Sequence, residues 1–258
     1  AGLVGDGRGR VVGVVEVSLP EWDNTHTGWV DVTVAPVSRG QGIGRRMFEE
    51  GVERVRAAGR TLLLSESFEL SPGVGFLKAM GLDRASDVVQ RRQDLLTTDW
   101  THLAETYADA ERHGGDYELL RLPGAIPDEL LADAVAMTAA INDAPIDGLD
   151  IEDEVFSPER IRAFETSQRA YGRRTYRIVA RERRTGELAG HTQVAVEADR
   201  PWFGAQFDTS VLRAHRGHRL GLLLKIAMMR WLARWGPSAG TPVASSEARI
   251  SALNRSMS

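Results

Sequence analysis

An internal repeat constrains the fold of this chain more than any other feature of its sequence. When the 258-residue chain is shifted by 177 residues, Gly13 in "VVGVVEVSL" falls on Gly190 in "LAGHTQVAV". Asp31 then falls on Asp208 without any insertion between the two pairs. The same register matches Val34 with Val211, Arg39 with Arg216, Gly40 with Gly217 and Gly44 with Gly221. The chain is therefore expected to contain two copies of one unit.

The two copies are incomplete at different ends. Copy two has a full lead-in before its hairpin: a strand "DYELLRL", a helix "PDELLADAVAMTAAIN" and a helix "SPERIRAFETSQRAYG" that opens on Ser157 as N-cap. Copy one lacks this lead-in but continues beyond its glycine loop through "RTLLLSESF", "GVGFLKAMGL" and "ASDVVQRRQDLL". In copy two the strand after the loop helix is unclear, and the final helix and strands are expected to be missing. We predict a first domain over 1–97, a linker helix over 98–115 and a second domain over 116–258.

Composition narrows the class of protein. There are no cysteines, which excludes disulfides, thiolate metal sites and a cysteine nucleophile. The net charge of −4 argues against broad nucleic-acid binding. No uninterrupted apolar run reaches the length of a transmembrane helix, and no signal peptide is visible at the start. We expect a soluble cytoplasmic protein with no membrane partner.

The stretch "RGQGIGRRMFEE" predicts an anion-binding loop. Three glycines before a helix let backbone amides approach a phosphate, and the helix N-terminus contributes a partial positive charge. A Walker loop is excluded because the required Lys is absent. A Rossmann loop fits poorly, because Arg45 stands at the third glycine and five residues separate the strand from the glycines, although Glu66 lies at a suitable distance. A coenzyme A pyrophosphate loop and a merely flexible turn remain as alternatives.

The segment "VAPVSRGQGIG" resembles the acetyl-CoA motif of the GNAT superfamily of N-acetyltransferases, R/Q-x-x-G-x-G/A. "GVGFLKAMGL" is similar to a later motif of that family, and "DTSVLRAHRGHRLGLLLK" resembles the same loop in tandem, two-domain members of actinobacterial type. The resemblance implies an α/β fold of two GNAT-like domains, each with a mixed, mostly antiparallel sheet flanked by helices. It also implies acetyl-CoA as the cofactor.

The resemblance carries a set of cofactor contacts onto this chain. In copy one, backbone groups of Val32 and Val34 would bind pantetheine, and the loop and first helical turn would hold the pyrophosphate: Arg39, Gly40, Gln41, Gly42, Ile43, Gly44 and Arg45. In copy two the matching residues are Val211, Arg216, Gly217, His218, Arg219, Leu220 and Gly221. Two residues depart from the family pattern: Arg219 stands where a glycine is expected, and Leu77 stands where the family has a tyrosine acid.

Asp31 and Asp208 are the candidate catalytic residues, because acyl transfer to an amine needs a base and both lie on the strand before the loop. Each is either a general base, an anchor for a cationic acceptor or a solvent-facing residue of an alternating strand. Copy two is favoured for turnover, since copy one lacks the helices that wall an acceptor cleft. The acidic residues Glu152 to Glu154 either attract a cationic amine or form a solvated loop, and His215 and His218 are expected to line the phosphate pocket. No metal site is expected.

The leading hypothesis is an acetyl-CoA-dependent N-acetyltransferase that transfers an acetyl group directly to a primary amine. The sequence does not identify the acceptor, a small molecule or a protein, nor the oligomeric state. Alternatively, one or both domains bind coenzyme A without turnover, as a structural or sensing module, and Leu77 favours this for copy one. A Rossmann-type NAD enzyme is the third alternative.

Overall fold

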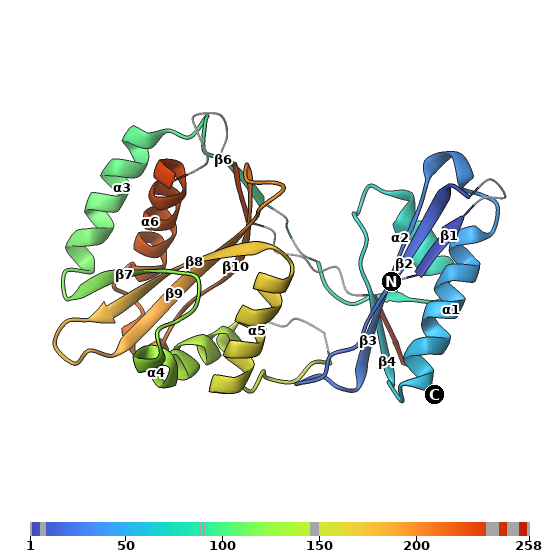
Figure 1. Cartoon of the computed structure of the whole chain (residues 1–258), viewed down its shortest axis with the longest axis horizontal. Coiled ribbons are helices and arrows are strands. Elements are labelled where there is room, and N and C mark those ends of the chain that lie inside the picture. The colour runs from blue at the N-terminus through green and yellow to red at the C-terminus, as the bar shows by residue number, and fades with distance from the viewer. Residues whose placement is uncertain are drawn as a thin grey trace. The chain divides into compact units, whose positions relative to one another are not determined.

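The structure is a computed structural model that describes residues 2–5, 9–87, 89, 91–144, 150–235, 243–246 and 253–256. The chain divides into two compact units, each built from segments that are distant in sequence (Figure 1). Unit 1 comprises residues 1–89, 145–154 and 249–258, and unit 2 comprises residues 90–144 and 155–248.

Unit 1 is a six-stranded sheet with one long helix on one face. Its strands follow the order β1-β2-β3-β4-β12-β5, and only β3 and β4 pair in parallel. The elements are β1 (Gly2–Gly5), β2 (Val11–Ser18), β3 (Thr27–Val34), η1 (Pro36–Ser38), α1 (Ile43–Ala57), β4 (Leu62–Ser65), α2 (Pro72–Ala79), β5 (Asp83–Arg84) and β12 (Leu253–Ser256).

The apolar core of unit 1 lies between α1 and the sheet. Met47, Phe48 and Val55 of α1 are buried against Val15 and Val30 of the sheet. A Cβ placed on Gly13 would fall 2.7 Å from Met47 Sδ, so this glycine permits the close approach of α1 to β2. Each buried large apolar side chain of this kind stabilises the fold by about 1.5–3 kcal/mol.

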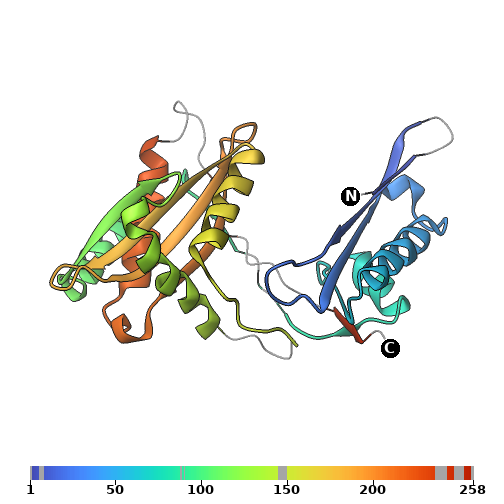
Figure 2. The same ribbon diagram turned by 60° about the horizontal axis from the view of Figure 1, so that its bottom comes forward.

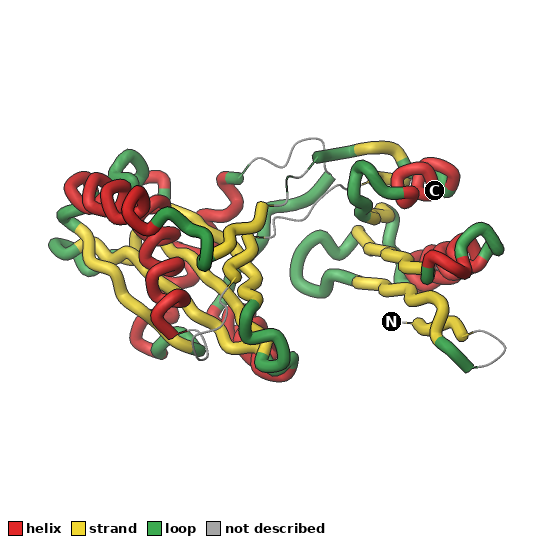
Figure 3. Tube along the Cα trace, turned by 90° about the horizontal axis from the view of Figure 1, so that it is seen from above, coloured by secondary structure: helices red, strands yellow, loops and turns green. Residues whose placement is uncertain are grey.

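Unit 2 is a six-stranded sheet with helices on both faces (Figures 1 and 3). Its strands follow the order β6-β11-β10-β9-β8-β7, with β10 and β11 parallel. The strands are β6 (Arg91–Asp94), β7 (Tyr117–Pro123), β8 (Arg173–Glu182), β9 (Leu188–Glu197), β10 (Phe203–Val211) and β11 (Val243–Ser246). The helices are α3 (Trp100–His113), α4 (Asp128–Ala139), η2 (Ala140–Asp143), α5 (Pro158–Ala170), η3 (Arg213–His215) and α6 (Leu220–Trp235).

Two separate cores cover the two faces of this sheet. The first joins α3 and α6 to the sheet through Ala110, Ile178, Leu224 and Met228. The second lies under α4 and α5 and contains Ala134, Met137, Ile161 and Val179. Ser157 caps α5 as predicted, since its hydroxyl accepts a hydrogen bond from Arg160 N at 3.2 Å.

The repeat predicted from the sequence is present in the structure. Elements η3 and α6 begin 177 residues after η1 and α1, and β10 ends 177 residues after β3. Each mixed sheet is mostly antiparallel and flanked by helices, as expected for the fold class. Gly190, like Gly13, has no room for a side chain, but the atom that a Cβ would meet is Ser210 O of the neighbouring strand β10, at 2.6 Å.

The ends of the two copies are exchanged between the units. Strand β6 follows the first copy in sequence but pairs with β11 in unit 2. Strand β12, at the far end of the chain, lies between β4 and β5 in unit 1, where it is the red arrow beside the label C in Figure 2. Strand β11 follows the loop helix α6 and pairs in parallel with β10, so it is the strand that the sequence left unclear.

The helix within the range 98–115 is α3, and it packs on α6 inside unit 2. Gly114 caps its end, within the range predicted for a linker helix. The connection between α4 and α5 contributes residues 150–154 to unit 1, where Ile151 packs against Leu62 and Leu64.

Candidate active site

The glycine loop of unit 1 has the backbone geometry of an anion cradle. Gly40 and Gly42 adopt φ values of 76° and 77°, a region that only glycine enters without strain. The first hydrogen bond across the start of α1 runs from Arg46 N to Gly42 O. The amides of Ile43, Gly44 and Arg45 precede that bond and are available to an anion, as at any helix N-terminus.

The strand before this loop presents its backbone to an open edge. The parallel register of β3 and β4 ends at Trp29 with Leu64, so the two strands separate beyond this pair. Ala35 N donates to Val12 O of β2. Since backbone groups alternate in direction along a strand, the N–H and C=O groups of Val32 and Val34 point away from β2, towards the side where β3 and β4 separate. This is the edge that an extended amide ligand can pair with.

The arginine that opens each loop makes the same contact in both units. Arg39 Nε donates to Val34 O at 3.0 Å, and Arg216 Nε donates to Val211 O at 3.1 Å. This bond closes the loop onto the end of the strand and leaves the terminal nitrogens of each guanidinium for other partners. The carbonyls of Val34 and Val211 are therefore committed within the protein, and the N–H groups at this edge remain for a ligand.

The loop of unit 2 has the same backbone shape, but an arginine stands where unit 1 has a glycine with a positive φ. Gly217 has a φ of 91°, and Arg219 has a φ of 55° at the position of Gly42. Leu223 N donates to Arg219 O at the start of α6, so the helix begins as in unit 1. A Cβ on Gly221 would meet open space, whereas one on Gly44 would lie 3.5 Å from the Phe76 ring.

The loop arginines of unit 2 are already paired with carboxylates. Asp143, at the end of η2, binds Arg213 at 2.9 Å and Arg216 at 2.6 Å. Arg213, its first partner, and Arg216 hold the pKa of Asp143 below its usual value. Arg219 pairs with Asp109 of α3. Across the described part of the chain, no carboxylate pairs with Arg39, so the unit 1 loop offers phosphate a freer guanidinium.

A β-bulge places Asp208 in unit 2. The register between β9 and β10 passes from Gln206 opposite Val194 to Thr209 opposite Thr192, so Phe207 and Asp208 together oppose Gln193. The side-chain amide of Gln206 closes the bulge by donating to Gln193 O at 2.7 Å and to Phe207 O at 3.1 Å. The pairing of β2 with β3 in unit 1 is regular, with Asp31 opposite Glu16.

Asp208 is held against a buried histidine and a buried arginine. Its Oδ2 lies 2.7 Å from His191 Nε2, and Arg177 Nη1 donates to His191 Nδ1 at 2.9 Å. Arg177 also donates to Gln193 Oε1. The side chains of Asp208 and His191 lie on the face of the sheet that α4 covers. Ser210 is opposite His191 in the ladder, and its hydroxyl donates to Met137 O of α4. The Asp208 side chain keeps 22% exposure, so it is not sealed in the core.

The pKa values of this group follow from burial and charge. Burial acts to raise the pKa of Asp208, but His191 and the positive charge of Arg177 outweigh it and the pKa falls below the ordinary value. Burial lowers the pKa of His191. Burial also lowers the pKa of Lys225 of α6, against the attraction of Asp208. Asp208 is thus ionised and His191 neutral at neutral pH.

Asp31 has different surroundings from Asp208. Its Oδ1 accepts from Glu66 N at 3.3 Å and from Ser65 Oγ at 3.4 Å, both beyond the end of β4's register with β3. Val14 stands in unit 1 where His191 stands in unit 2. The sequence made both aspartates candidates and favoured copy two, and the structure places a histidine beside Asp208.

His215 does not line the phosphate pocket: it is buried, with Nδ1 2.9 Å from the Tyr117 hydroxyl. The acidic run belongs to unit 1, where Glu152 N donates to Asn24 Oδ1 at 2.6 Å and Asp150 O lies 2.9 Å from His26 Nε2.

Leu77 is 3% exposed in the core of unit 1, so its side chain faces no open site. His218 is half-buried beside Tyr117, their ring centroids 5.4 Å apart.

Sequence reasoning missed His191, Arg177, Gln206 and Asp143. A signal for the first two existed, since "RTYRIVARE" and "LAGHTQVAVE" carry polar residues within strands that are buried on both faces. No pattern in the sequence marked Gln206, because a bulge depends on the register of two strands. Asp143 lies 70 residues before Arg213, and only the fold brings them together.

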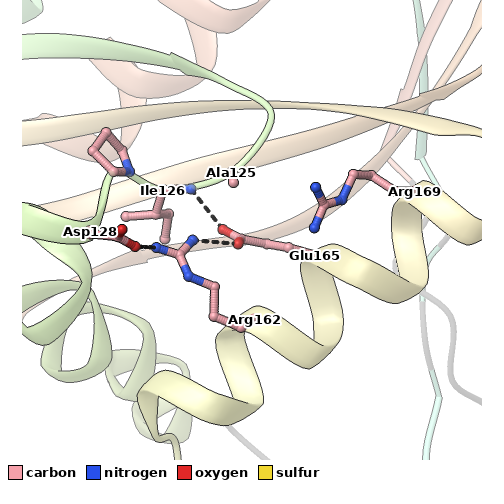
Figure 4. Close-up of a pocket in the computed structure, with 7 residues that line it drawn as sticks. Ala125, Ile126, Asp128, Arg162, Glu165 and Arg169 are labelled. Atoms are coloured by element: carbon pink, nitrogen blue, oxygen red, sulfur yellow. Dashed lines mark hydrogen bonds and ion pairs between the residues drawn. The ribbon is translucent and has the colours of Figure 1, made fainter.

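A cavity of about 390 Å³ lies on the α4–α5 side of unit 2 (Figure 4). Arg162 lines it and binds Asp128 and Glu165, and the Glu165 carboxylate also accepts from Ile126 N at 2.7 Å. Arg169 lies further along α5 in the same view. The described residues contain no helix long and apolar enough to cross a membrane and no cluster of three metal-ligating side chains.

Two mixed sheets, each opening beside a glycine loop that leads into a helix, define a tandem acyltransferase. A search of protein-family models matches residues 2–81 to the acetyltransferase (GNAT) family. The chain is 30% identical to a solved tandem GNAT protein from the clavulanic acid biosynthesis pathway, with a TM-score of 0.70 over 96% of this chain and 74% of that one. The chain belongs to the GNAT family and is an N-acetyltransferase, for which acetyl-CoA-dependent acetylation of amines is the general reaction.

More distant structures share the fold. A GCN5-related N-acetyltransferase from Sphaerobacter thermophilus is 14% identical, with a TM-score of 0.59 over 98% of this chain and 71% of that chain. The glucosamine N-acetyltransferase region of a fungal multi-domain GH3 β-N-acetylglucosaminidase is 12% identical, with a TM-score of 0.56 over 98% of this chain and 32% of that chain. A search of curated protein sequences found no match.

Proposed function

We propose that unit 2 catalyses the transfer of an acetyl group from acetyl-CoA to a primary amine, with Asp208 as the residue that handles the acceptor. The observation that carries this proposal is the contact between Asp208 and the buried His191 on the α4 face of the sheet, beside the bulge in β10. Acetyl-CoA supplies the thioester, an acyl group already activated for attack by an amine.

The ionised carboxylate of Asp208 attracts the acceptor as its ammonium form and orients the nitrogen. A carboxylate with a lowered pKa is a weak base towards a free ammonium, whose pKa is near ~10. The ammonium must first lose one proton to solvent, because only the neutral amine has a lone pair that can attack the carbonyl carbon. Once the nitrogen is bonded to that carbon it becomes acidic, so a weak base suffices to take its second proton while the C–S bond breaks and the thiol is released. Asp208 acts directly or through one water molecule.

The cofactor contacts proposed for unit 2 are the N–H groups at the open edge of β10 near Val211 and the first amides of α6. Arg216 and Arg219 contribute positive charge, and each must share or leave its aspartate partner when a pyrophosphate binds. The residues present therefore fit coenzyme A, at the cost of two ion pairs that are half exposed and individually weak.

For unit 1 we propose binding of coenzyme A without turnover. Its loop has two glycines in the left-handed region and no aspartate on Arg39 among the described residues. Leu77 is buried where the family has an acid, and Val14 takes the place of His191. These features support a structural or sensing role for this unit.

The test is the consumption of acetyl-CoA with a panel of primary amines, followed by the release of free thiol. Transfer to at least one amine is expected, and consumption with none of them would count against the proposal.

Binding stoichiometry tests the role of unit 1. Gly42→Glu should remove one of two coenzyme A sites, because the new carboxylate fills the cradle beside phosphate. A wild-type stoichiometry of one that Gly42→Glu leaves unchanged would show that unit 1 does not bind.

A further inference from the structure

The two polar side chains next to Asp208, His191 and Arg177, are buried more deeply than is usual for ionisable groups. His191 has no exposed surface, and Arg177 is 5% exposed. A buried guanidinium is costly unless it is paired and hydrogen-bonded. Unit 1 folds to the same sheet with Val14 at the position of His191, so the fold itself does not require this group.

The contacts of Arg177 fix the proton on His191. A guanidinium only donates hydrogen bonds, so the Nδ1 that lies 2.9 Å from Arg177 Nη1 must be the nitrogen without a proton. The proton of the neutral ring then sits on Nε2, the atom 2.7 Å from Asp208 Oδ2. Arg177 also blocks protonation of Nδ1, so the ring has no site at which to become charged.

The charges around this group balance without a proton on Asp208. Arg177 from β8 faces Asp208 and also feels Glu165 from α5, while Lys225 of α6 feels Asp208 from the other helix layer. Glu165 is also paired with Arg162 at 2.6 Å, so the positive charges of Arg177 and Lys225 act on an ionised Asp208 beside a neutral imidazole. Asp208 Oδ2 and His191 Nε2 are buried 2.7 Å apart, and neither atom has another hydrogen-bond partner among the described residues, so each is left to the other. The exposed part of the carboxylate is then the part free to meet a substrate.

We infer that His191 and Arg177 are positioning residues of the unit 2 active site: Arg177 locks His191 as an Nε2–H donor, and His191 holds one oxygen of Asp208 so that the other faces the acceptor amine. This inference rests on the proposed function, in which Asp208 handles the amine. It assigns two residues that no sequence motif marked, and Gln193 completes the set as a second acceptor for Arg177.

The first test is the protonation of His191 in the full chain by nitrogen-15 NMR of the imidazole. Nε2 is expected to carry the proton and Nδ1 to be bare, with no titration of the ring near its ordinary pKa of about 6.5. A proton on Nδ1, or a ring that titrates near that value, would overturn the inference. This result does not depend on finding a substrate, so it separates failure of the inference from failure of the proposed function.

The second test is the pH dependence of kcat/KM with an amine that the wild type acetylates. His191→Leu removes the donor while Asp208 stays partly buried, so the pKa of Asp208 rises and the acid limb of the profile moves to higher pH. We expect kcat to fall about 10-fold or more, with the KM for acetyl-CoA within about twofold. His191→Gln, which keeps an N–H donor, should recover much of the loss, and Arg177→Met should move the acid limb in the same direction as His191→Leu.

His215→Leu is the matched control, because it removes another buried histidine from the same unit and should leave the acid limb in place. Equal acid limbs in wild type and His191→Leu, or an equal shift in His215→Leu, would reduce His191 to a structural residue.

Discussion

At the scale of single residues, the glycine loops of the two units differ at one position where the backbone has a positive φ. Gly42 and Arg219 occupy the same place in the repeat and both adopt a positive φ, but only glycine does so without a steric cost. The Arg219 side chain offsets part of that cost by pairing with Asp109 of α3. The loop of unit 2 thus keeps the cradle geometry by a less favourable route.

Replacing Arg219 with Gly and with Ala separates these two contributions. Both variants lose the pair with Asp109, but Ala retains the strained conformation and Gly relieves it. Arg219→Gly should be more stable than Arg219→Ala by about 1 kcal/mol in the free energy of unfolding, measured by denaturant titration. Equal stabilities would mean that this position carries no backbone strain.

At the scale of elements, the bulge in β10 distinguishes the two sheets. Gln206 satisfies carbonyl groups of Gln193 and Phe207 that the extra residue would otherwise leave without ladder partners. Trp29 stands at the matching position of unit 1, where the ladder is regular. The side chain of Gln206 is therefore part of what holds the bulge next to Asp208.

Gln206→Met keeps the length of the side chain and removes the donor. It should lower the free energy of unfolding by about 1–3 kcal/mol, because buried carbonyls lose their partner. Turnover should also fall at temperatures where the variant is fully folded. An unchanged unfolding curve with unchanged turnover would show that the bulge does not depend on Gln206.

At the scale of the whole molecule, each sheet contains a strand from the far end of the other copy. β12 lies in the interior of the unit 1 sheet, with Asn254 opposite both Leu64 and Asp83. β6 lies at the edge of the unit 2 sheet, with Arg92 opposite Ser245. Neither unit completes its sheet from a continuous stretch of chain.

Proline at Asn254 tests this exchange, because it removes a ladder donor from an interior strand. Asn254→Pro should speed hydrogen exchange in β4 and β5 of unit 1 while the amides of β8 and β9 stay protected. Arg92→Pro should give the reciprocal pattern, with faster exchange in β11 and a protected unit 1. Faster exchange in unit 2 for Asn254→Pro would place β12 elsewhere.

Features that depend on a local pattern could be predicted from the sequence, whereas features that depend on residues distant in the chain could not. The repeat, the loop before α1 and the cap at Ser157 are visible in short stretches, because spacing and residue type decide them. The strand exchange and the partners of Asp208 are not, since β12 and His191 reach their places only through the register of the sheets. Arg219 shows an intermediate case: its departure from the motif was visible, but its pairing with Asp109 was not.

The central claim is that acetyl transfer takes place in unit 2 on Asp208. The most direct test compares turnover of acetyl-CoA by Asp208→Asn and Asp31→Asn with that of the wild type, at equal saturation with the best amine of the panel. Asp208→Asn should lose about 100-fold or more in kcat with little change in acetyl-CoA affinity, and Asp31→Asn should lose far less. An equal or larger loss in Asp31→Asn would move the chemistry to unit 1 and contradict the claim.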